Sequence, residues 1–554
     1  MKPIKIFLGD ITMTDDVITA MAAVERWLGN PVSLSLISFV ATDDECGNRL
    51  TNAIDVYLGM KKDLCWKCRL AGKIVGYTIN KSSQLFGVNE VDIRQGLTET
   101  VFKRGLINVL GGIARYGITR PQMVNAPFLV VWDFTHMCNL RCRHCYQDAQ
   151  KALPGELTTV EAKKLVDQLS DAGVVVIAFS GGEPLMRKDF FEIAAYAHQR
   201  DLYVALASNG TMITPPVAKN LHNAGVDYVE VSIDGMDAAS HDAMRGISGA
   251  FDRSVEGIKN CVAEGIYSCI ATTVTQENYD QIPEIHKLGQ NLGVKRLMCF
   301  NFIPTGRGTR MANQDLTPCQ REDLLKFILS QDKKGMAPEI LSTAPQFARV
   351  ALSDDTDNGV PVGHFHSGNG LQGRTRMLAD FIGGCGAGRL YCSIEPDGDV
   401  QPCVFLPVAV GNVRERPFLD IWHDASVLRQ LRDRSCLEGH CSTCENKLVC
   451  GGCRARAWAY YGRPILNFAR PGSPRPGVGV LREPECPGSR LHEQYLILER
   501  NLLTGAGAPA LPVTAGIGLQ SSPSYDPDPV DPATSTSFFT QLAVFLCFSF
   551  CVDF

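Results

Sequence analysis

The central part of the chain alternates between short apolar runs and amphipathic segments, and this alternation predicts its architecture. Apolar runs rich in β-branched and aromatic residues predict strands near 128–135, 174–179, 202–207, 226–233, 267–274 and 296–303. Helical periodicity predicts helices near 158–172, 189–200, 214–224, 251–264 and 280–291. Six successive strand–helix units predict an α/β fold in which a parallel sheet curls into a partial (β/α)6 barrel resembling a TIM barrel.

The residues at the ends of these helices support the same assignment. Thr158 and Thr214 stand where an N-cap is needed, because a hydroxyl accepts hydrogen bonds from the first free amides of a helix. Gly173, Gly225 and Gly265 follow helices where a left-handed residue would end them. Function in such folds gathers at the carboxyl ends of the strands, so we expect the chemistry there.

A loop with three cysteines follows the first strand. Cys138, Cys142 and Cys145 have the spacing Cys-x3-Cys-x2-Cys, which can turn three thiolates toward one point. A [4Fe–4S] cluster usually takes four cysteine ligands, so three would leave one iron open to a small molecule. Zinc is the alternative, but a structural zinc site needs four closed ligands. His144 would have to supply the fourth from the same crowded loop.

The second strand is followed by Gly181-Gly182-Glu183-Pro184, where the absence of a Cβ lets the backbone approach a ligand. The cysteine loop and this motif together resemble the radical S-adenosylmethionine (SAM) enzymes, over residues 127–461. In that family the open iron binds SAM, and one electron cleaves SAM to methionine and a 5′-deoxyadenosyl radical. The resemblance implies that Cys138, Cys142 and Cys145 hold the catalytic cluster.

The same resemblance implies a SAM pocket at the ends of the following strands. Gly181, Gly182 and Glu183 would hold the SAM amino group, Ser208 and Asn209 would lie at the ribose, and Ser232 and Arg245 would also contact SAM. A guanidinium suits the SAM carboxylate because it binds carboxylates in a bidentate way. The alternative for Arg245 is an ordinary surface arginine.

A second group of cysteines lies nearer the C-terminus, around a predicted hairpin turn at Pro396–Asp399. Pairs of Cys-x2-Cys alone would favour zinc. Because the same chain also contains the first cysteine loop, this second group resembles the SPASM extension of radical SAM enzymes. The resemblance implies two auxiliary [4Fe–4S] clusters. One cluster would be held by Cys385, Cys392, Cys403 and Cys453, and the other by Cys441, Cys444, Cys450 and Cys486. A Pro/Gly-rich insertion at residues 463–479 separates Cys486 from the other cysteines, so Cys436 is an alternative to Cys486.

Two classes of function remain open. The stretches 241–257 and 343–347 resemble the branch that matures haem-type tetrapyrroles and related cofactors, while enzymes that modify ribosomally made peptides share much of the pattern. Either would need a reducing partner such as a ferredoxin or flavodoxin. The other class is a non-catalytic iron–sulfur electron carrier or scaffold, which would have no use for Gly181–Glu183, Ser208 and Ser232.

The composition of the chain limits the partners and the compartment that can be expected for the protein. The formal net charge of −5 implies no basic face for nucleic acid. The chain has 21 cysteines and no secretory leader, which predicts a cytoplasmic protein whose cysteines bind metal. Its 554 residues predict several regions: an N-terminal region at 1–125, the barrel at 126–310, a linker at 311–380, the SPASM domain at 381–490 and a disordered tail at 491–554.

The two ends are harder to interpret. Helical periodicity at 15–27 and 99–116 predicts a mainly helical N-terminal region. Its Cys46, Cys65 and Cys68 are interpreted as ordinary thiols or a weak structural site rather than a functional metal or redox site, since a fourth cysteine or histidine is lacking. The tail ends in an apolar run of about 14 residues, short of the ~20 needed to cross a bilayer. Surface docking and a non-native reading frame both remain open.

Overall fold

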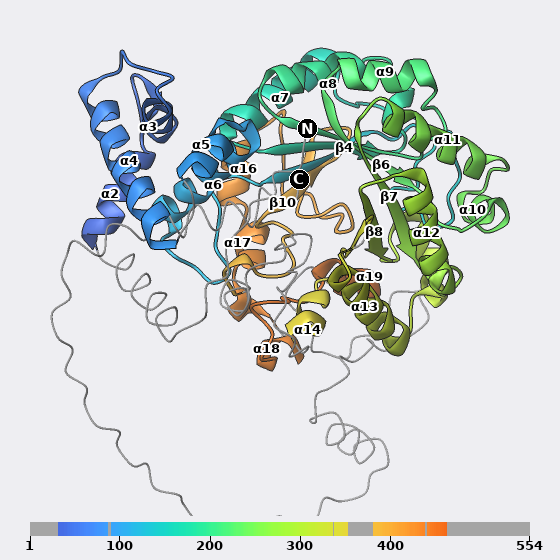
Figure 1. The fold of residues 1–554 in the computed structure, drawn as a ribbon. Coiled ribbons are helices and arrows are strands. Elements are labelled where there is room, and N and C mark those ends of the chain that lie inside the picture. The colour runs from blue at the N-terminus through green and yellow to red at the C-terminus, as the bar shows by residue number, and fades with distance from the viewer. Residues whose placement is uncertain (1–30, 87–89, 336, 353–379, 438–439, 462–554) are drawn as a thin grey trace, which may run out of the picture.

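The computed structural model describes residues 31–86, 90–335, 337–352, 380–437 and 440–461, arranged as a central barrel with two attached regions. Figure 1 shows the barrel strands in the middle, helices around their outside, and the N-terminal helices at one side. The cysteine-rich region adjoins the first barrel strand in the same sheet. The predicted helix at 15–27, Cys486 and the tail lie outside the described residues.

All six predicted strands form, and they pair in parallel in chain order. They are β3 (Leu129–Thr135), β4 (Val176–Gly181), β5 (Tyr203–Ser208), β6 (Val226–Ser232), β7 (Tyr267–Val274) and β8 (Arg296–Asn301). Both faces of these strands are covered, which is why their sequences are almost continuously apolar. The α/β fold is therefore confirmed.

The predicted helices also form, with a further short helix between two of them. They are α7 (Thr159–Ala172), α8 (Phe190–Gln199), α9 (Pro215–Asn223), α10 (Ala238–Arg245), α11 (Ala250–Ala263) and α12 (Ile282–Leu292). Thr158 begins α7 with a capping box that includes Glu161, and Gly173 ends it with a φ of 90°. Helix α10 was not predicted, because its eight residues are too few to show clear helical periodicity.

The sheet is wider than the barrel that was predicted. In the described residues it has ten strands in the order β12-β11-β10-β3-β4-β5-β6-β7-β8-β9. The segment predicted as a linker supplies η3 (Gly306–Gln314), α13 (Pro318–Lys333), β9 (Glu339–Ser342), which extends the sheet beyond β8, and α14 (Phe347–Leu352). At the other edge, β10 (Tyr391–Ile394) pairs in parallel with β3.

The cysteine-rich region therefore shares a sheet with the barrel. The predicted turn at Pro396–Asp399 joins β10 to β11 (Asp399–Gln401), and β12 (Gly411–Asn412) follows. Because β10 is hydrogen-bonded to β3, the strand that leads into the cysteine loop, the two cysteine groups are fixed relative to each other. The remaining elements here are α16 (Phe418–Asp424), α17 (Ser426–Arg432), η4 (Arg434–Cys436), α18 (His440–Thr443) and α19 (Arg454–Tyr461).

The N-terminal region is helical, as predicted, and its last helix docks on the barrel. It consists of α2 (Pro31–Ala41), β1 (Asp43–Asp44), β2 (Gly47–Asn48), α3 (Arg49–Leu58), α4 (Trp66–Phe86), α5 (Glu90–Thr98) and α6 (Thr100–Tyr116). From α6, the Arg104 guanidinium donates to the carbonyls of Ser170 and Val174, at the end of α7 and just before β4. Helices α2 to α4 stand farther from the barrel (Figure 1).

A cluster of buried aromatic rings supports the two strands that carry the candidate motifs. Trp132 and Phe134 of β3, Phe179 of β4 and Phe190 of α8 are all fully buried. Phe134 meets Trp132 and Phe179 edge to face, with ring centroids 5.0 and 5.2 Å apart. Such pairs add to the hydrophobic free energy of burial and have defined geometry. They hold the carboxyl ends of β3 and β4 in register.

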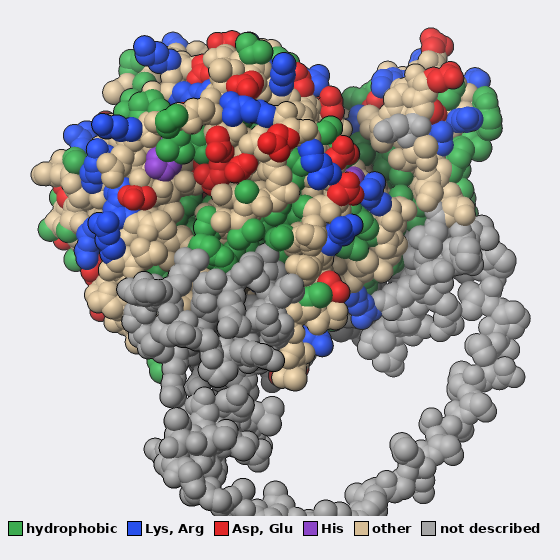
Figure 2. All heavy atoms as spheres, turned by 180° about the vertical axis from the view of Figure 1, so that it is seen from behind, with side chains coloured by type: hydrophobic (Ala, Val, Ile, Leu, Met, Phe, Trp, Pro, Cys, Tyr) green, Lys and Arg blue, Asp and Glu red, His purple; other side chains and the backbone are tan. Residues whose placement is uncertain are grey.

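Charged side chains of both signs are interspersed on the face shown in Figure 2, in keeping with the small net charge. In the part of the chain that the structure describes, no helix is both long enough and apolar enough to span a bilayer.

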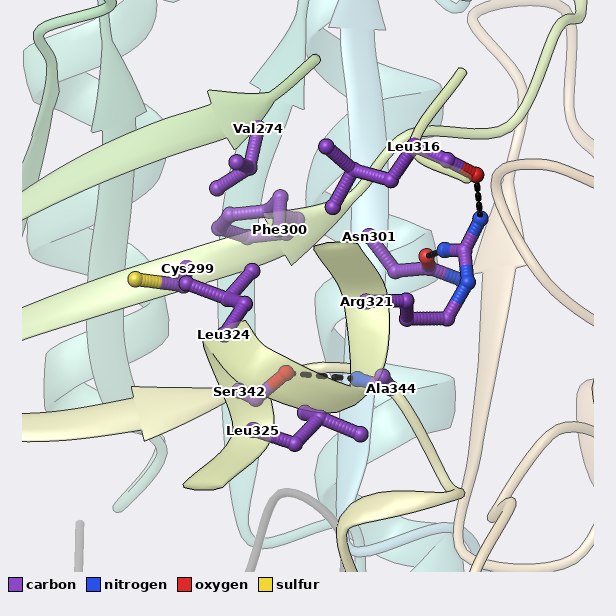
Figure 3. Close-up of a pocket in the computed structure, with 10 residues that line it drawn as sticks. All are labelled: Val274, Cys299, Phe300, Asn301, Leu316, Arg321, Leu324, Leu325, Ser342 and Ala344. Carbon is purple, nitrogen blue, oxygen red and sulfur yellow. Dashed lines mark hydrogen bonds between the residues drawn. The ribbon is translucent and has the colours of Figure 1, made fainter. Parts of the chain in front are cut away.

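A buried charge network ties α19 of the cysteine-rich region to the far side of the barrel. Asp315 accepts hydrogen bonds from Arg321 of α13 at 2.9 Å, from Arg456 of α19 at 2.5 Å and from the Tyr460 hydroxyl at 2.6 Å. Arg321 also donates to the Leu316 carbonyl, above a small apolar pocket between β8, β9 and α13 (Figure 3). Asp315 thus neutralises two guanidiniums that would otherwise be buried without an anion.

Replacing Asp315 is therefore expected to destabilise the protein strongly. Asp315→Asn leaves Arg321 and Arg456 buried without a countercharge, and we expect the free energy of unfolding to fall by about 3–5 kcal/mol, measured by urea denaturation. Glu256→Gln is the matched control, because Glu256 pairs with Lys259 on an exposed helical surface, and such pairs contribute only about 0.5 kcal/mol. Equal effects of the two substitutions would contradict the importance of the network.

Candidate active site

The cysteine loop between β3 and α7 is held from two sides by backbone hydrogen bonds. Its Arg141 and Arg143 amides donate to the carbonyls of Arg245 and Met244, at the end of α10, at 3.1 and 2.9 Å. On the other side, the Arg307 amide donates to the Cys145 carbonyl at 2.9 Å. The loop is therefore fixed without needing contacts between its own side chains.

The Gly-Gly motif packs directly on the start of this loop. The Gly182 amide donates to the Thr135 carbonyl and the Glu183 amide to the Met137 carbonyl, both at 2.7 Å. A Cβ added to Gly182 would lie 2.1 Å from the Met137 oxygen, and Gly181 has a φ of +106° that disfavours any other residue. The glycines thus allow a close approach of two backbones, one of which carries the cysteines.

The three thiols of the loop suit a cluster better than a single zinc ion. Cys138, Cys142 and Cys145 are all partly buried, and burial raises the pKa of Cys138 to about 11 and also raises that of Cys142. In the described residues their sulfurs do not form a set lying within 4.8 Å of one another, whereas sulfurs on one tetrahedral zinc are about 3.8 Å apart. Ligands of an iron–sulfur cube bind different irons and stand farther apart.

Arg245 links the loop to a buried carboxylate. Its guanidinium pairs with Asp234 at 2.6 Å and also donates to the Cys142 sulfur at 3.6 Å. Burial opposes the charge on Asp234, but the Arg245 guanidinium holds its pKa below the usual range. His144 lies 3.3 Å from Asp234 through Nε2, and burial lowers its pKa to about 4, so it is neutral at pH 7. This position turns His144 toward Asp234 rather than toward a metal shared with the cysteines.

Glu183, Ser208 and Asn209 form one buried group at the ends of β4 and β5. The Glu183 carboxylate accepts from the Ser208 hydroxyl at 2.9 Å and the Asn209 amide at 2.8 Å. The Asn209 side chain donates in turn to Asn139 in the cysteine loop at 2.8 Å. Burial raises the pKa of Glu183 to about 7, and no cation of the described residues pairs with it. A bound cationic ligand, such as the sulfonium of SAM, would supply the missing charge. Ser232 ends β6 and is partly buried.

Two carboxylates beside the loop were not identified from the sequence. Asp133 of β3 accepts from the Tyr146 hydroxyl at 2.8 Å and from Gln147 at 2.7 Å, and Gln147 also donates to Glu395, just after β10. Burial raises the pKa of both carboxyls, and the negative charge of Glu395 raises that of Asp133 further. Both carboxyls therefore keep a proton more readily than carboxyls exposed to water. An aspartate inside an otherwise apolar strand was the available signal.

The auxiliary cysteines are only partly brought together as predicted. Cys385, Cys403 and Cys453 lie close enough that a thiolate at one raises the pKa of another. Tyr391 donates to the Cys403 sulfur at 3.0 Å, so the next residue of the strand, Cys392, points to the opposite face of β10. There it is fully buried in the apolar core. The predicted ligand set thus fails to converge at Cys392, because strand alternation separates it from the other three.

The other predicted set is described only in part. Cys441, Cys444 and Cys450 are partly buried near α18, and the Cys385 amide donates to the Cys450 carbonyl at 3.0 Å, which joins the two sets. Cys436, the substitute ligand, lies in η4 with its thiol directed to Asp433 at 3.5 Å. Cys486 lies outside the described residues.

Buried arginines surround the auxiliary cysteines. Arg389, Arg434 and Arg454 are almost fully buried, and in the described part of the chain none of them pairs with a carboxylate. Burial lowers the pKa of Arg389 to about 9, and burial and the other two arginines lower that of Arg434. Several of their nitrogens lack a hydrogen-bond partner. An anionic iron–sulfur cluster on the neighbouring cysteines would provide the charge that this group lacks.

Comparison with known proteins identifies the family. Models of the radical SAM superfamily and of the SPASM iron–sulfur cluster-binding domain match residues 132–289 and 385–445. An AdoMet-dependent heme synthase of Methanosarcina barkeri is 39% identical over 61% of this chain and 95% of its own length. The chain belongs to the radical SAM/SPASM enzymes. It is thus an enzyme that uses [4Fe–4S] clusters and SAM.

Other relatives carry names that refer to different products. The pre-heme d1 synthase of Dinoroseobacter shibae is 31% identical over 61% of this chain and 84% of its own length. The mycofactocin maturase MftC of Mycobacterium tuberculosis is 33% identical over 62% of this chain and 82% of its own length. SuiB of Streptococcus suis, solved with SAM bound, has a TM-score of 0.52 at 16% identity, covering 74% of this chain and 89% of SuiB, which shows the shared fold.

The close approach of Gly182 to the cysteine loop predicts that a single methyl group will disturb the cluster. Gly182→Ala should displace Met137 and the adjoining cysteines, and we expect the reconstituted protein to lose up to about four iron atoms per chain, measured by iron analysis. Gly96→Ala is the control, since a Cβ there meets Phe102 at an ordinary 3.5 Å. Full iron content in Gly182→Ala would show that the loop can relax around the methyl group.

Proposed function

We propose that this radical SAM/SPASM enzyme modifies a tetrapyrrole. The observation that carries the proposal is the 39% identity to an AdoMet-dependent heme synthase across 95% of that protein. Relatives named as an Fe-coproporphyrin III synthase and a pre-heme d1 synthase, at 36% and 31% identity, favour the same substrate class. As part of this proposal the enzyme works in the cytoplasm with a ferredoxin or flavodoxin as its reductant.

In the proposed active site Cys138, Cys142 and Cys145 hold the catalytic cluster, and SAM, when bound there, supplies the radical that abstracts a hydrogen atom. Gly181 and Gly182 keep the backbone of the pocket against the loop. Glu183 faces the positive charge of SAM, held in place by Ser208 and Asn209. These residues orient SAM and exclude water around it, since the carboxylate and its donors are buried.

Arg245 and Ser232 complete the proposed pocket from β6 and α10. Because Asp234 already pairs with Arg245, we propose that Arg245 acts mainly on the charge of the catalytic cluster through Cys142. The carboxyl pair of Asp133 and Glu395 is proposed to hold the proton that substrate chemistry requires, with Tyr146 aligned on Asp133.

We propose two auxiliary clusters that relay electrons or position the substrate. Cys385, Cys403 and Cys453 would hold one, without Cys392, and Cys441, Cys444 and Cys450 would hold the other together with a ligand outside the described residues. The uncompensated charge of Arg389, Arg434 and Arg454 supports an anionic cluster in this region.

A peptide substrate is the second candidate. The 33% identity to a mycofactocin maturase, over 82% of that protein, supports it almost as well as the tetrapyrrole relatives support the first. A direct comparison of substrates separates the two.

We expect the reconstituted enzyme, with dithionite and SAM, to form 5′-deoxyadenosine faster when an iron porphyrin carrying propionates is added, and to change the mass of that porphyrin. Chromatography and mass spectrometry measure both. Cys142→Ala should lower the rate at least about 100-fold, because the open iron is lost with the cluster. Cys319→Ala, at an exposed cysteine on α13, should leave it unchanged. Acceleration by a peptide and not by any porphyrin would reject the tetrapyrrole proposal.

The raised pKa of Glu183, about 7, predicts a pH dependence of SAM binding. A protonated Glu183 is neutral and cannot stabilise a cation, so affinity should fall as the pH drops below about 7, by at most about tenfold per pH unit. Equilibrium dialysis of the reconstituted enzyme from pH 8 to 5.5 measures this change. Glu183→Gln should weaken binding at pH 8 and flatten the profile. An unchanged profile in this variant would assign the titration to another group.

A further inference from the structure

Four potential metal ligands converge in the N-terminal helical region, on the outer part of the molecule (Figure 1). The ligand atoms of Asp44, Cys46, Cys65 and Cys68 all lie within 4.8 Å of one another, and no other set of this kind occurs among the described residues. The three cysteines are evident in the sequence, but a fourth ligand is not. The fold supplies one, because the β1–β2 hairpin brings Asp44 against the start of α4.

The spacing of these atoms suits a single ion. The Cys68 sulfur lies 3.9 Å from both oxygens of Asp44, and the Cys65 sulfur lies 4.0 Å from one of them. Tetrahedral zinc, with bonds of about 2.0–2.3 Å, holds its ligand atoms about 3.5–3.8 Å apart. These two thiols therefore need to approach Asp44 by only about half an ångström. A multi-iron cluster would require them to spread.

The surrounding groups orient the ligands and offset their charge. The Cys68 amide donates to the Cys65 sulfur at 3.4 Å, which favours the thiolate form that binds metal. The Asp44 carboxylate accepts from the Cys46 amide at 2.9 Å and from the Arg49 guanidinium at 3.0 Å. Asn52 donates to the Cys46 carbonyl at 2.8 Å and lies 3.7 Å from the Cys68 sulfur.

The ligand chemistry favours a metal site over the simpler alternative of a redox pair. A Cys65–Cys68 disulfide would need only those two residues, whereas here a third cysteine and a carboxylate, itself only 13% exposed, face the same point. Three thiolates and a carboxylate suit zinc, and four protein ligands leave no open position. Such a closed site is structural and would tie the hairpin to α3 and α4.

We propose that Asp44, Cys46, Cys65 and Cys68 bind one Zn²⁺ ion as a structural site that is separate from the iron–sulfur clusters and from SAM. The inference is independent of the proposed substrate, since none of these residues lies in the barrel.

Zinc analysis of the full-length protein, reconstituted with its clusters and then exposed to zinc sulfate and desalted, tests the proposal. We expect about one zinc per chain, and a zinc K-edge spectrum with three sulfurs at about 2.3 Å and one oxygen at about 2.0 Å. The double substitution Cys65→Ser, Cys68→Ser should lower the zinc content at least tenfold. Cys142→Ala and Cys319→Ser are the controls, and both should keep the zinc.

Asp44→Cys gives an independent test if the double variant does not fold. It should keep about one zinc, and its spectrum should change from three sulfurs to four. An unchanged sulfur count, zinc retained by the double variant, or no zinc in the unsubstituted chain would each overturn the proposal. Loss of about four iron atoms in the double variant, with no zinc in any form, would instead assign a further cluster to these residues.

Discussion

The structure depends on a contact between two backbones that leaves no room for a side chain. Gly182 lies against Met137, and hydrogen bonds from Gly182 and Glu183 fix the strand that leads into the cysteines. The contact is possible because β3 and β4 are neighbouring parallel strands whose carboxyl ends are held by buried aromatic rings. Metal binding costs less when the ligands are already positioned, and here the sheet fixes the start of the cysteine loop.

Charge imposes the second constraint. Carboxylates near the catalytic loop and guanidiniums near the auxiliary cysteines are both buried, and several lack a partner of opposite charge. Burying an isolated charge raises the free energy of the folded protein. A fold that keeps such charges therefore implies a bound group of opposite charge that stabilises them. The signs of these charges fit the sites that we propose: Glu183 lacks a cation in the proposed SAM pocket, and Arg434 lacks an anion beside the proposed auxiliary cluster.

The parts of the fold that could be predicted are those set by local sequence. The six strands, the N-cap at Thr158 and the hairpin turn at Gly398 all follow from periodicity or from one residue's conformational preference. The pairing of β10 with β3 could not be predicted, because it joins segments more than 250 residues apart in sequence. The orientation of Cys392 followed from that pairing, and spacing alone could not reveal it.

The same distinction explains what was missed at the sites. Asp234, Asp133 and Asp44 are all aspartates with no motif around them, and each matters only through residues that the fold brings near: Arg245, Glu395 and Cys68. A cysteine motif can be recognised from its spacing, because one short loop supplies several ligands. A carboxylate from another part of the chain can complete the set of ligands without leaving any motif in the sequence. An incomplete cysteine motif is therefore weak evidence against a metal site, since the fourth ligand can come from a neighbouring hairpin, as Asp44 does here.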